Sequence, residues 1–299
     1  MYPGVRRAAN ARRTPISTVR AIGGITVTAQ IIALCNQKGG VGKSTTTFQL
    51  GRRAVLRGRK VLLVDNDPQG NLTSVAAADV VDEDQAGLAD ALSARAPETI
   101  RDVIVPGVWP GLDVVPTSGT TLGYVRDELV IAGAGREGRL RDALTAVADD
   151  YDLILIDCAP SLDQLTINGL TAAEHVAIVT HSKLFSTNGL AELLKTIDNV
   201  RQYYNPALDV AGIIINQHEE KTVSGQTWVT ELRTAMATRT DATGNPAPIT
   251  VLAQPIPKRV SISDATEAAR GLDEWGTAEA RDLGSLYDDH LTALEGARS

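Results

Sequence analysis

The sequence predicts an α/β fold built on a mostly parallel sheet, and three observations support this prediction. Continuous apolar runs recur along the chain, as in Lys60–Asp65 and Asp152–Asp157, and such runs are typical of strands buried on both faces of a parallel sheet. Segments with the apolar spacing of helices separate these runs, and no long linker or low-complexity stretch intervenes. The chain has 299 residues, 43% of them hydrophobic, which suffices for a sizeable core. We therefore expect a single domain at residues 26–299, preceded by an arm at residues 1–25.

The strongest local signal lies at residues 31–45, where an apolar run meets a glycine-rich turn and then a helical pattern. Glycines let the backbone turn with its N–H groups directed at an anion, and the start of the helix adds a positive dipole end. Lys43 can reach terminal phosphates from this position, and the Ser44 hydroxyl can ligate Mg²⁺. The segment therefore predicts a phosphate-binding loop between a strand and a helix.

This loop departs from the usual phosphate-loop spacing at one place. The common pattern requires glycine at position 37, and the chain has Gln37 there, followed by an additional lysine, Lys38. A dinucleotide-binding pattern fails as well, because a glycine is required three residues after Gly42 and Thr45 stands there. The segment thus favours a site for a nucleoside triphosphate over a site for a dinucleotide.

The next elements extend the same unit. A helix is expected at Ser44–Arg57 and should end at Gly58, because glycine is a common C-terminal stop. The buried strand Lys60–Asp65 follows and ends in a turn that contains Asp65 and Asp67. Because ligands of open α/β sheets bind beyond the carboxyl ends of the strands, these acids are candidates for nucleotide chemistry rather than helix caps alone.

Residues 72–150 are less regular. Thr99–Val105 and Leu112–Val115 are expected to be short strands, and Arg139–Ala148 is expected to be an amphipathic helix. The run Asp152–Asp157 then closes on an acid, which is the form of an element whose carboxylate holds the water shell of Mg²⁺. Combined with the phosphate loop, it predicts a metal-dependent nucleotide site.

The second half continues the alternation. Strands are expected at Val176–Thr180, Ala211–Asn216 and Ile249–Ala253, and helices at Gly189–Tyr203, Val223–Ala237 and Thr277–Leu294. The four histidines are scattered singly, so we assign them no catalytic or metal-binding role.

The charge and the cysteines limit the possible partners and compartments. The net charge is −7, yet the first 30 residues hold five arginines and no acid. We expect this arm to be disordered, and three interpretations of it stay open: a solvated tail or an over-extended start codon, a basic arm on DNA phosphates, and, least favoured, a transit peptide. Cys35 and Cys158 lie in apolar strand-like runs, which favours buried free thiols in a reducing cytoplasm. No apolar run approaches the roughly 20 residues of a membrane span.

Four stretches of the chain together resemble a known family. Residues 38–44 read Lys-Gly-Gly-Val-Gly-Lys-Ser, residues 64–73 read Val-Asp-Asn-Asp-Pro-Gln-Gly-Asn-Leu-Thr, and residues 157–162 read Asp-Cys-Ala-Pro-Ser-Leu. Residues 256–265 read Ile-Pro-Lys-Arg-Val-Ser-Ile-Ser-Asp-Ala, with Asp264 where glutamate is more usual. In this order they are similar to the motifs of ParA-type DNA partition ATPases in the ParA/MinD family. Its deviant Walker A motif is marked by the lysine before the glycine pair. The resemblance covers residues 30 to about 294.

The resemblance implies a doubly wound P-loop NTPase fold and the cofactors ATP and Mg²⁺. The implied catalytic residues are Lys38, which would reach the ATP of a partner subunit, Lys43, and Asp67, which would position the attacking water. The implied cofactor-binding residues are Lys38, Gly39, Gly40, Val41, Gly42, Lys43, Ser44 and Thr45, with Asn216, Pro255, Ile256 and Pro257 toward the adenine. The implied metal-site residues are Ser44, Asp157 and Asp65, and Asp65 would support either Mg²⁺ or the loop.

The resemblance also implies a working cycle and its partners. An ATP-dependent homodimer would bind double-stranded DNA without sequence preference, and a ParB-type protein would stimulate hydrolysis and release, in the cytoplasm on the nucleoid. Lys258, Arg259 and Lys221 are the expected DNA contacts. The main alternative is a MinD-like positioning ATPase at a membrane or on another large cargo, but the acidic last helix disfavours a membrane anchor. A scaffold that binds ATP with negligible hydrolysis stays open.

Overall fold

The computed structural model describes residues 20–22, 25–27, 29–182, 187–219, 222–241 and 243–296. Its centre is a seven-stranded sheet in the order β5–β6–β4–β7–β3–β8–β9. All neighbouring strands run parallel except β5 and β6, which pair antiparallel. The strands are β3 Gln30–Cys35, β4 Val61–Asn66, β5 Val105–Pro106, β6 Leu112–Val115, β7 Leu153–Cys158, β8 His175–His181 and β9 Asp209–Asn216. The predicted mostly parallel α/β sheet is confirmed.

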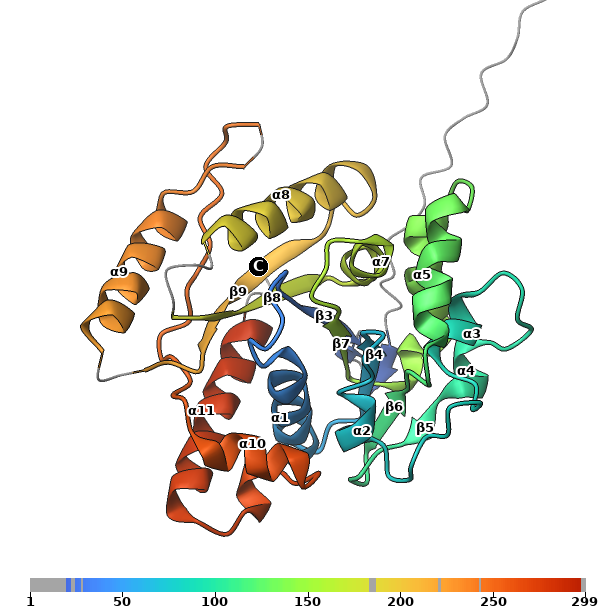
Figure 1. Ribbon diagram of the computed structural model, residues 1–299, viewed down its shortest axis with the longest axis horizontal. Helices are drawn as coiled ribbons and strands as arrows, with labels where there is room; N and C mark the ends of the chain where they lie inside the picture. Colours follow the sequence, from blue (N-terminus) through green and yellow to red (C-terminus); the bar gives the residue numbers. More distant parts are fainter. Residues whose placement is uncertain are drawn as a thin grey trace, which may run out of the picture.

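Helices cover both faces of this sheet (Figure 1). They are α1 Lys43–Leu56, α2 Thr73–Ala76, α3 Leu88–Leu92, α4 Ile100–Val103, α5 Thr121–Ile131, α6 Arg139–Thr145, α7 Gln164–Ala172, α8 Thr187–Tyr203, α9 Val223–Ala237, α10 Val260–Glu267 and α11 Ala278–Glu295. Short 3₁₀ turns lie at Arg136–Gly138, Ala148–Asp150 and Leu272–Glu274. Figure 1 places α1, α10 and α11 on one face and α5, α7 and α8 on the other.

The side chains of each strand alternate between two cores. In β3, Ile31 and Ala33 pack with the helices around α5 to α9, whereas Ile32 and Leu34 pack with α1, α10 and α11. All of these side chains are buried, which explains why the run reads as apolar throughout rather than alternating. The two cores make the doubly wound arrangement visible in the packing.

Several predicted elements are confirmed closely. Helix α1 ends at Leu56, and Gly58 follows with φ of 77°, a left-handed conformation that glycine adopts without steric cost. Helix α9 spans Val223–Ala237 as predicted, and α11 spans Ala278–Glu295, so both of its ends lie one residue later than predicted.

Two predicted strands are wrong. Residues 100–103 form the short helix α4, because Asp102 accepts hydrogen bonds from the backbone N–H and hydroxyl of Thr99 at 2.8 and 2.6 Å and so caps a helical turn. Only Val105–Pro106, at the end of the predicted Thr99–Val105 strand, pairs with β6. The predicted strand Ile249–Ala253 makes a single bridge, Val251 to Ile213, on the edge of β9. Prolines on both sides of it lack the N–H that a longer ladder requires.

The predicted arm lies largely outside the described residues. At its end, Arg20–Ile22 and Ile25–Val27, the second of which extends two residues beyond the arm, form an antiparallel pair, β1 and β2, separate from the main sheet. Nothing else in residues 1–28 is described, so the three interpretations of the arm stay predictions.

Candidate functional site

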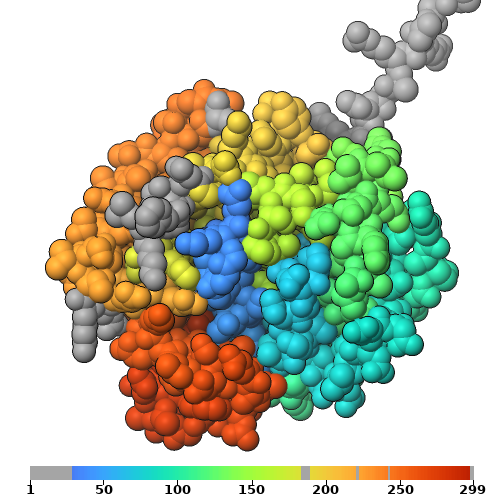
Figure 2. All heavy atoms as spheres, in the orientation of Figure 1, coloured from blue at the N-terminus to red at the C-terminus, as the bar shows by residue number. Residues whose placement is uncertain are grey.

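The loop between β3 and α1 reaches the molecular surface at the carboxyl ends of the central strands. In Figure 2 its blue residues lie beside both the cyan segment that follows β4 and the yellow-green segment that follows β7. Asn36 anchors the start of the loop: its amide donates to the Val179 carbonyl of β8 at 2.6 Å and accepts from the Lys38 N–H at 2.9 Å. Gly40 and Gly42 have φ of 71° and 82°, so the two sharpest corners fall on glycines. A side chain at position 42 would also overlap the Asn216 amide.

The two lysines of the loop occupy different environments. Lys43, the first residue of α1, is only 6% exposed and lies inside the site. Lys38 lies on the exposed outer part of the loop. A buried lysine beneath a loop of backbone N–H groups suits a phosphate of the same molecule. An exposed lysine on the rim is placed for a ligand or protein outside it.

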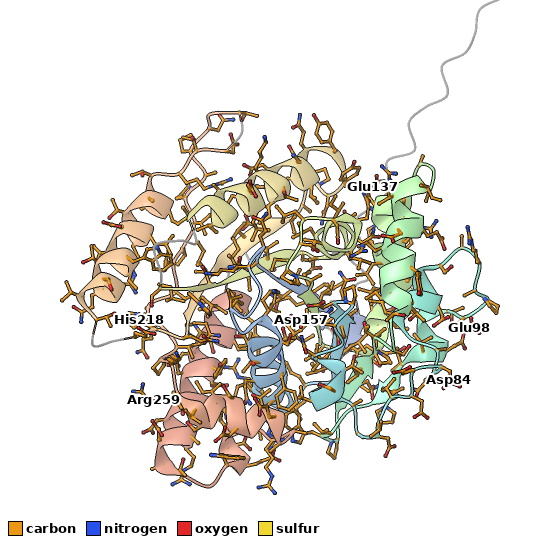
Figure 3. The ribbon with its side chains drawn as sticks, viewed as in Figure 1. Asp84, Glu98, Glu137, Asp157, His218 and Arg259 are labelled. Carbon is orange, nitrogen blue, oxygen red and sulfur yellow. The ribbon has the colours of Figure 1, made fainter. Side chains whose placement is uncertain are left out.

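Asp65 and Asp157 end two neighbouring strands and stand directly opposite each other in the β4–β7 register. Both are fully buried. Burial, reinforced by the negative charge of Asp65, raises the pKa of Asp157 to about 8, although Ser44 and Lys43 act in the opposite direction. Neither Asp157 oxygen makes a hydrogen bond of ordinary geometry. Figure 3 shows Asp157 at the centre of the molecule beside the start of α1.

An unpartnered, buried carboxylate is costly unless a cation or water completes it. The two open oxygens of Asp157, with the Ser44 hydroxyl at the start of α1, therefore fit Mg²⁺ or its bound water. Among the described residues, no cluster of three or more His, Cys, Asp or Glu side chains forms a metal cage.

Asp65 is used differently from Asp157. One of its oxygens accepts from both the N–H and the hydroxyl of Thr73 at 2.7 Å, and the other accepts from the Asp67 N–H at 3.4 Å. Burial raises the pKa of Asp65 to about 7, and the Thr73 hydrogen bonds oppose this rise. Thr117, at the end of β6, donates to the Asp65 carbonyl at 2.6 Å. Asp65 therefore supports the segment after β4, and this favours loop support over direct contact with a metal.

Asp67 lies in the turn that Asp65 holds. Its side chain accepts from the Gln69 N–H at 3.0 Å, its carbonyl accepts from the Gly70 N–H at 3.0 Å, and the residue is 6% exposed. A cleft of about 570 Å³ adjoins this turn and is lined by Gln69, Gly70, Thr73, Ser74, Ala77, Ala78, Asp79, Val80, Val81, Glu83, Thr117 and Gly119. Asp67 thus has a fixed position in this turn, but Gln69 and Gly70 line the cleft and Asp67 itself does not.

The residues expected near adenine lie together at the end of β9. The Asn216 amide donates to the Val41 carbonyl at 2.8 Å, so Asn216 already contacts the phosphate loop. The Ile256 N–H donates to the Ile215 carbonyl at 2.8 Å, which holds the Pro255–Pro257 turn against β9. The Ile256 side chain is fully buried in the core. The structure brings this turn and the loop together through Asn216.

The basic residues expected to contact DNA are spread more widely. Lys258 and Arg259 precede α10, where Arg259 pairs with Glu279 at 3.0 Å and Lys258 lies 4.0 Å from Glu219. Figure 3 shows Arg259 on the side of the molecule where α10 and α11 lie, away from Asp157. Lys221 lies outside the described residues. DNA contact at these positions stays a prediction.

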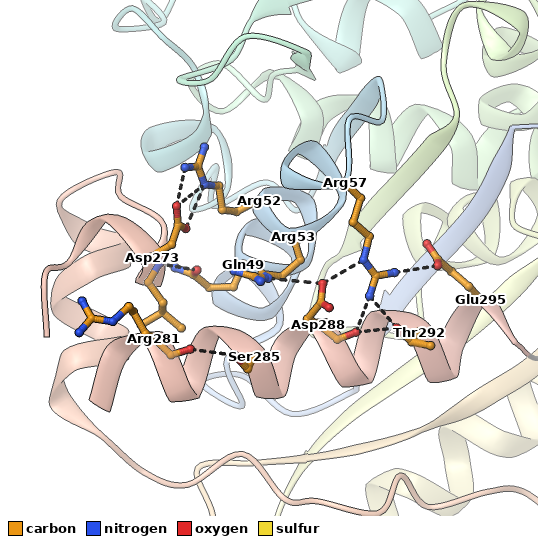
Figure 4. A network of polar contacts seen from close by, with 11 residues as sticks. Gln49, Arg52, Arg53, Arg57, Asp273, Arg281, Ser285, Asp288, Thr292 and Glu295 are labelled. Atoms are coloured by element: carbon orange, nitrogen blue, oxygen red, sulfur yellow. Dashed lines mark hydrogen bonds and ion pairs between the residues drawn. The ribbon is translucent and has the colours of Figure 1, made fainter. Parts of the chain in front are cut away.

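A polar network fixes helix α1, and with it Lys43, against the C-terminal helices (Figure 4). Arg52 pairs with Asp273 at 2.6 Å and lies 4.8 Å from the ring centre of Trp109. Arg57 bonds Asp288 at 2.9 Å and Glu295 at 3.1 Å on α11. Several charges on one helix therefore secure the element that begins the phosphate site.

Sequence reasoning missed some residues of this arrangement. Thr73 and Thr117 complete the Asp65 network, and Thr117 follows β6 just as the predicted site residues follow their strands. That position at a strand end was the available signal. Gln217, which donates to the Gly40 carbonyl at 3.3 Å, gave no comparable signal.

Within the described ranges, no helix is both long enough and apolar enough to cross a bilayer.

Comparison with protein-family models matches residues 29–210, more than half of the chain, to a family described as AAA domain. The chain is 35% identical over 277 residues to the chromosome-partitioning ATPase Soj of Treponema pallidum, covering 89% of this chain and 98% of that protein. It is 40% identical over 204 residues to the sporulation initiation inhibitor protein Soj of Bacillus subtilis, covering 68% and 79%. An uncharacterised Mycobacterium tuberculosis protein is 42% identical over 198 residues, and the chain spans 61% of its length.

The chain is also similar in fold to solved structures of proteins with different names. A cobyrinic acid a,c-diamide synthase of Mycobacterium smegmatis, with an ATP analogue and magnesium, is 32% identical with a TM-score of 0.67. The alignment covers 80% of this chain and 92% of that one. An ATP complex of a Cyanothece McdA variant has a TM-score of 0.76 at 19% identity, covering 91% and 98%, and this similarity concerns the fold alone.

Proposed function

Because the chain belongs to the AAA-domain family, and within it to the ParA and Soj group of partition ATPases, we propose that it hydrolyses ATP to move or position DNA. The observation that carries the proposal is the pairing of buried Lys43 with the buried, unpartnered carboxylate of Asp157 beneath a glycine-rich loop. A cation and an acid close enough to affect each other's charge thus lie at the start of α1, and phosphate and metal require this combination. The chemistry of the site follows from these groups.

Residues 39–45 bind the phosphates of ATP. The loop backbone and the start of α1 supply N–H donors, Lys43 neutralises the β and γ phosphates, and Thr45 contacts the α phosphate. Little covalent chemistry is required, because phosphoryl transfer depends mainly on positioning and on charge stabilisation. Lys43 is well suited to this task because it is already desolvated before the nucleotide arrives.

The Ser44 hydroxyl and the Asp157 carboxylate hold the metal side of the site. Mg²⁺ bound there would neutralise negative charge on the phosphates. Asp157 must lose its proton to act there, so metal binding is coupled to proton release. Asp65 keeps the neighbouring loop in place through Thr73 rather than by direct ligation.

Asp67 orients the attacking water and accepts its proton. The turn that holds Asp67 is fixed by Asp65, Gln69 and Gly70. A general base needs hydrogen-bond reach to the water that it activates. The negative charge of Asp67 acts on the buried Asp157, and this proximity supports the assignment.

Lys38 acts across a dimer interface on the ATP of the partner subunit. Its exposed position on the outer loop supports this assignment, since Lys43 already occupies the inner position. A cation supplied in trans makes assembly a condition of hydrolysis, comparable to an arginine finger. The rate of ATP hydrolysis would then set how long the two copies stay together.

The ATP-bound dimer binds double-stranded DNA without sequence preference on the nucleoid, and a ParB-type partner stimulates its release. Lys258, Arg259 and Lys221 are the proposed DNA contacts, and the adenine lies near Asn216 and the Pro255–Pro257 turn. The partition names of the relatives support this assignment. DNA binding of this kind weakens steeply with salt, because phosphate contacts release counterions.

The test measures phosphate release from ATP by the purified chain, first alone, then with nonspecific duplex DNA, then with the protein encoded next to it. We expect the rate to rise in the complete mixture, and DNA retention to require ATP and to fall with added salt. An unchanged rate in all three mixtures, with no ATP-dependent retention, would refute a partition ATPase.

Two other functions are separated by the same assay. A MinD-like positioning ATPase would respond to lipid vesicles instead of DNA. A synthase like the M. smegmatis protein of 32% identity would release phosphate only when an organic acid and an amide donor are added. The partition relatives of 35 to 40% identity favour DNA as the first choice.

A further inference from the structure

Three successive carbonyls of the phosphate loop are tied away from the site. The Gly40 carbonyl accepts from the side-chain amide of Gln217 at 3.3 Å, and the Val41 carbonyl accepts from the side-chain amide of Asn216 at 2.8 Å. The Gly42 carbonyl accepts from the Thr46 N–H at 2.9 Å as the first bond of α1. Two of these three ties come from one corner at the end of β9.

Because peptide units are planar and trans, these carbonyl contacts also fix the directions of the neighbouring backbone N–H donors. In each peptide unit the carbonyl of one residue and the N–H of the next point in opposite directions. The carbonyls of residues 40 and 41 are held toward the β9 corner and that of residue 42 toward α1, so the N–H groups of residues 41, 42 and 43 point away from these partners. Those N–H groups line the cradle that a phosphate occupies. The β9 corner thus determines how the cradle is oriented.

The backbone of the corner is itself strained. Among the described residues, only Gln217 and Ala269 combine a side chain with a positive φ, 50° and 54° respectively. A residue with a Cβ atom adopts this left-handed region at a cost, and such positions concentrate at functional sites. The Gln217 N–H donates to the Asn216 side chain at 2.9 Å, and the next N–H, of His218, donates to the Ile256 carbonyl at 2.8 Å. The neighbouring contacts hold the strained conformation.

We propose that Asn216 and Gln217 are positioning residues that pre-organise the phosphate loop, with Gln217 held in a left-handed conformation so that its amide reaches the Gly40 carbonyl. This rests on the proposed function, because it concerns how that site binds phosphate. His218 links the same corner to the Pro255–Pro257 turn through Ile256. The corner therefore joins the phosphate side of the site to the turn proposed for the base.

Gln217 permits a test that separates its side chain from its backbone. Gln217→Gly removes the amide and keeps the positive φ without strain, so the fold is preserved. Gln217→Asn keeps an amide donor on a residue that tolerates the left-handed region. Ala269→Gly is the matched control, because it relieves the same strain at a position just after α10 rather than at the β9 corner. The affinities of MgADP and of inorganic pyrophosphate are measured by displacement of a fluorescent ADP analogue, and thermal melting without nucleotide checks the fold.

Gln217→Gly should weaken both ligands by a similar factor, about fivefold for one lost hydrogen bond. Gln217→Asn should recover part of the loss, and Ala269→Gly should bind like the original chain. Unchanged binding by Gln217→Gly would overturn the inference. Weaker MgADP with unchanged pyrophosphate would also overturn it, since Gln217 would then act on the base or ribose. If the original chain binds neither ligand, the proposed function fails first.

Discussion

Replacing Asp157 by asparagine tests the electrostatics of the site while leaving its shape nearly unchanged. In the nucleotide-free chain the buried carboxyl has a pKa of about 8, far above the ordinary value of 3.8. Between these two pH values the folded state holds a proton that the unfolded chain has released. The free energy of unfolding therefore falls as pH rises through this window, and asparagine removes this dependence.

The magnitude follows from the two pKa values. One pKa unit corresponds to about 1.36 kcal/mol, so the difference sets an upper limit of roughly 5 kcal/mol at pH 8. Two effects reduce the gain from substitution. Lys43 loses a nearby carboxylate, and the new amide is buried without a hydrogen-bond partner, which costs about 1–3 kcal/mol. We expect Asp157→Asn to stabilise the nucleotide-free chain by about 2 kcal/mol at pH 8, or about 4 °C in melting temperature for a chain of this size.

The assay is thermal melting at pH 5 and pH 8, with and without MgATP. At pH 8 Asp157→Asn should melt higher than the original chain, and the difference should shrink at pH 5. MgATP should stabilise the original chain and leave the variant almost unaffected, because ligand stabilisation requires binding. Asp209→Asn, at an exposed position in β9, serves as the control and should change little at either pH. A variant less stable than the original at pH 8 would refute the reasoning.

The remaining predictions concern catalysis, the loop and the helix anchor. Asp67→Ala should slow hydrolysis at least about a hundredfold while ATP-bound dimers accumulate on sizing columns, and normal turnover would contradict its assignment as the base. Gly42→Ala should lower the free energy of unfolding by about 2 kcal/mol and abolish ATP binding, because position 42 has φ of 82° and faces the Asn216 amide. Normal ATP affinity in calorimetry would contradict this prediction. Arg52→Met should lower the free energy of unfolding in urea by about 1–2 kcal/mol, because the Asp273 ion pair and the Trp109 contact are lost. The control Arg281→Met, at an exposed position, should lower it by almost nothing. Equal losses would contradict the role of Arg52 in anchoring α1.

Those features of the fold that depend on local pattern were predictable from the sequence. The apolar runs that became β4 and β7 are buried on both faces, so their composition alone identified them, and their terminal acids followed directly. The glycines at positions 40 and 42 indicated the loop, because few other residues tolerate its positive φ angles. These signals are short-range, and each survives without knowledge of the tertiary structure.

The features that depend on partners distant in the sequence were not predictable in this way. Residues 100–103 are a different case, because the capping contact between Thr99 and Asp102 is local and still outweighed their strand-like composition. The Ile249–Ala253 segment lies at a sheet edge between prolines, where only one bridge forms. The contact of Gln217 with Gly40 joins residues 177 positions apart, and the positive φ that makes it possible leaves no mark in the composition.

The distinct positions of the two lysines illustrate the same limit. Their sequence spacing indicated an irregular phosphate loop, whereas their separation into a buried Lys43 and an exposed Lys38 required the folded chain. This separation is the physical basis for proposing that Lys43 acts on the ATP of its own subunit and Lys38 on the ATP of the partner subunit.

The most direct test of the ATP-bridged dimer mixes two inactive variants, Lys38→Ala and Asp67→Ala, and measures ATP hydrolysis with DNA present. In a mixed dimer the Lys38→Ala subunit keeps its own Asp67 and receives Lys38 from its partner, so one of the two sites is complete. Random pairing of equal amounts should therefore restore about a quarter of the original rate, although each variant alone is inactive. If Lys38 acts within its own subunit, no mixed dimer contains a complete site. The mixture would then stay as inactive as its components, which would contradict the account.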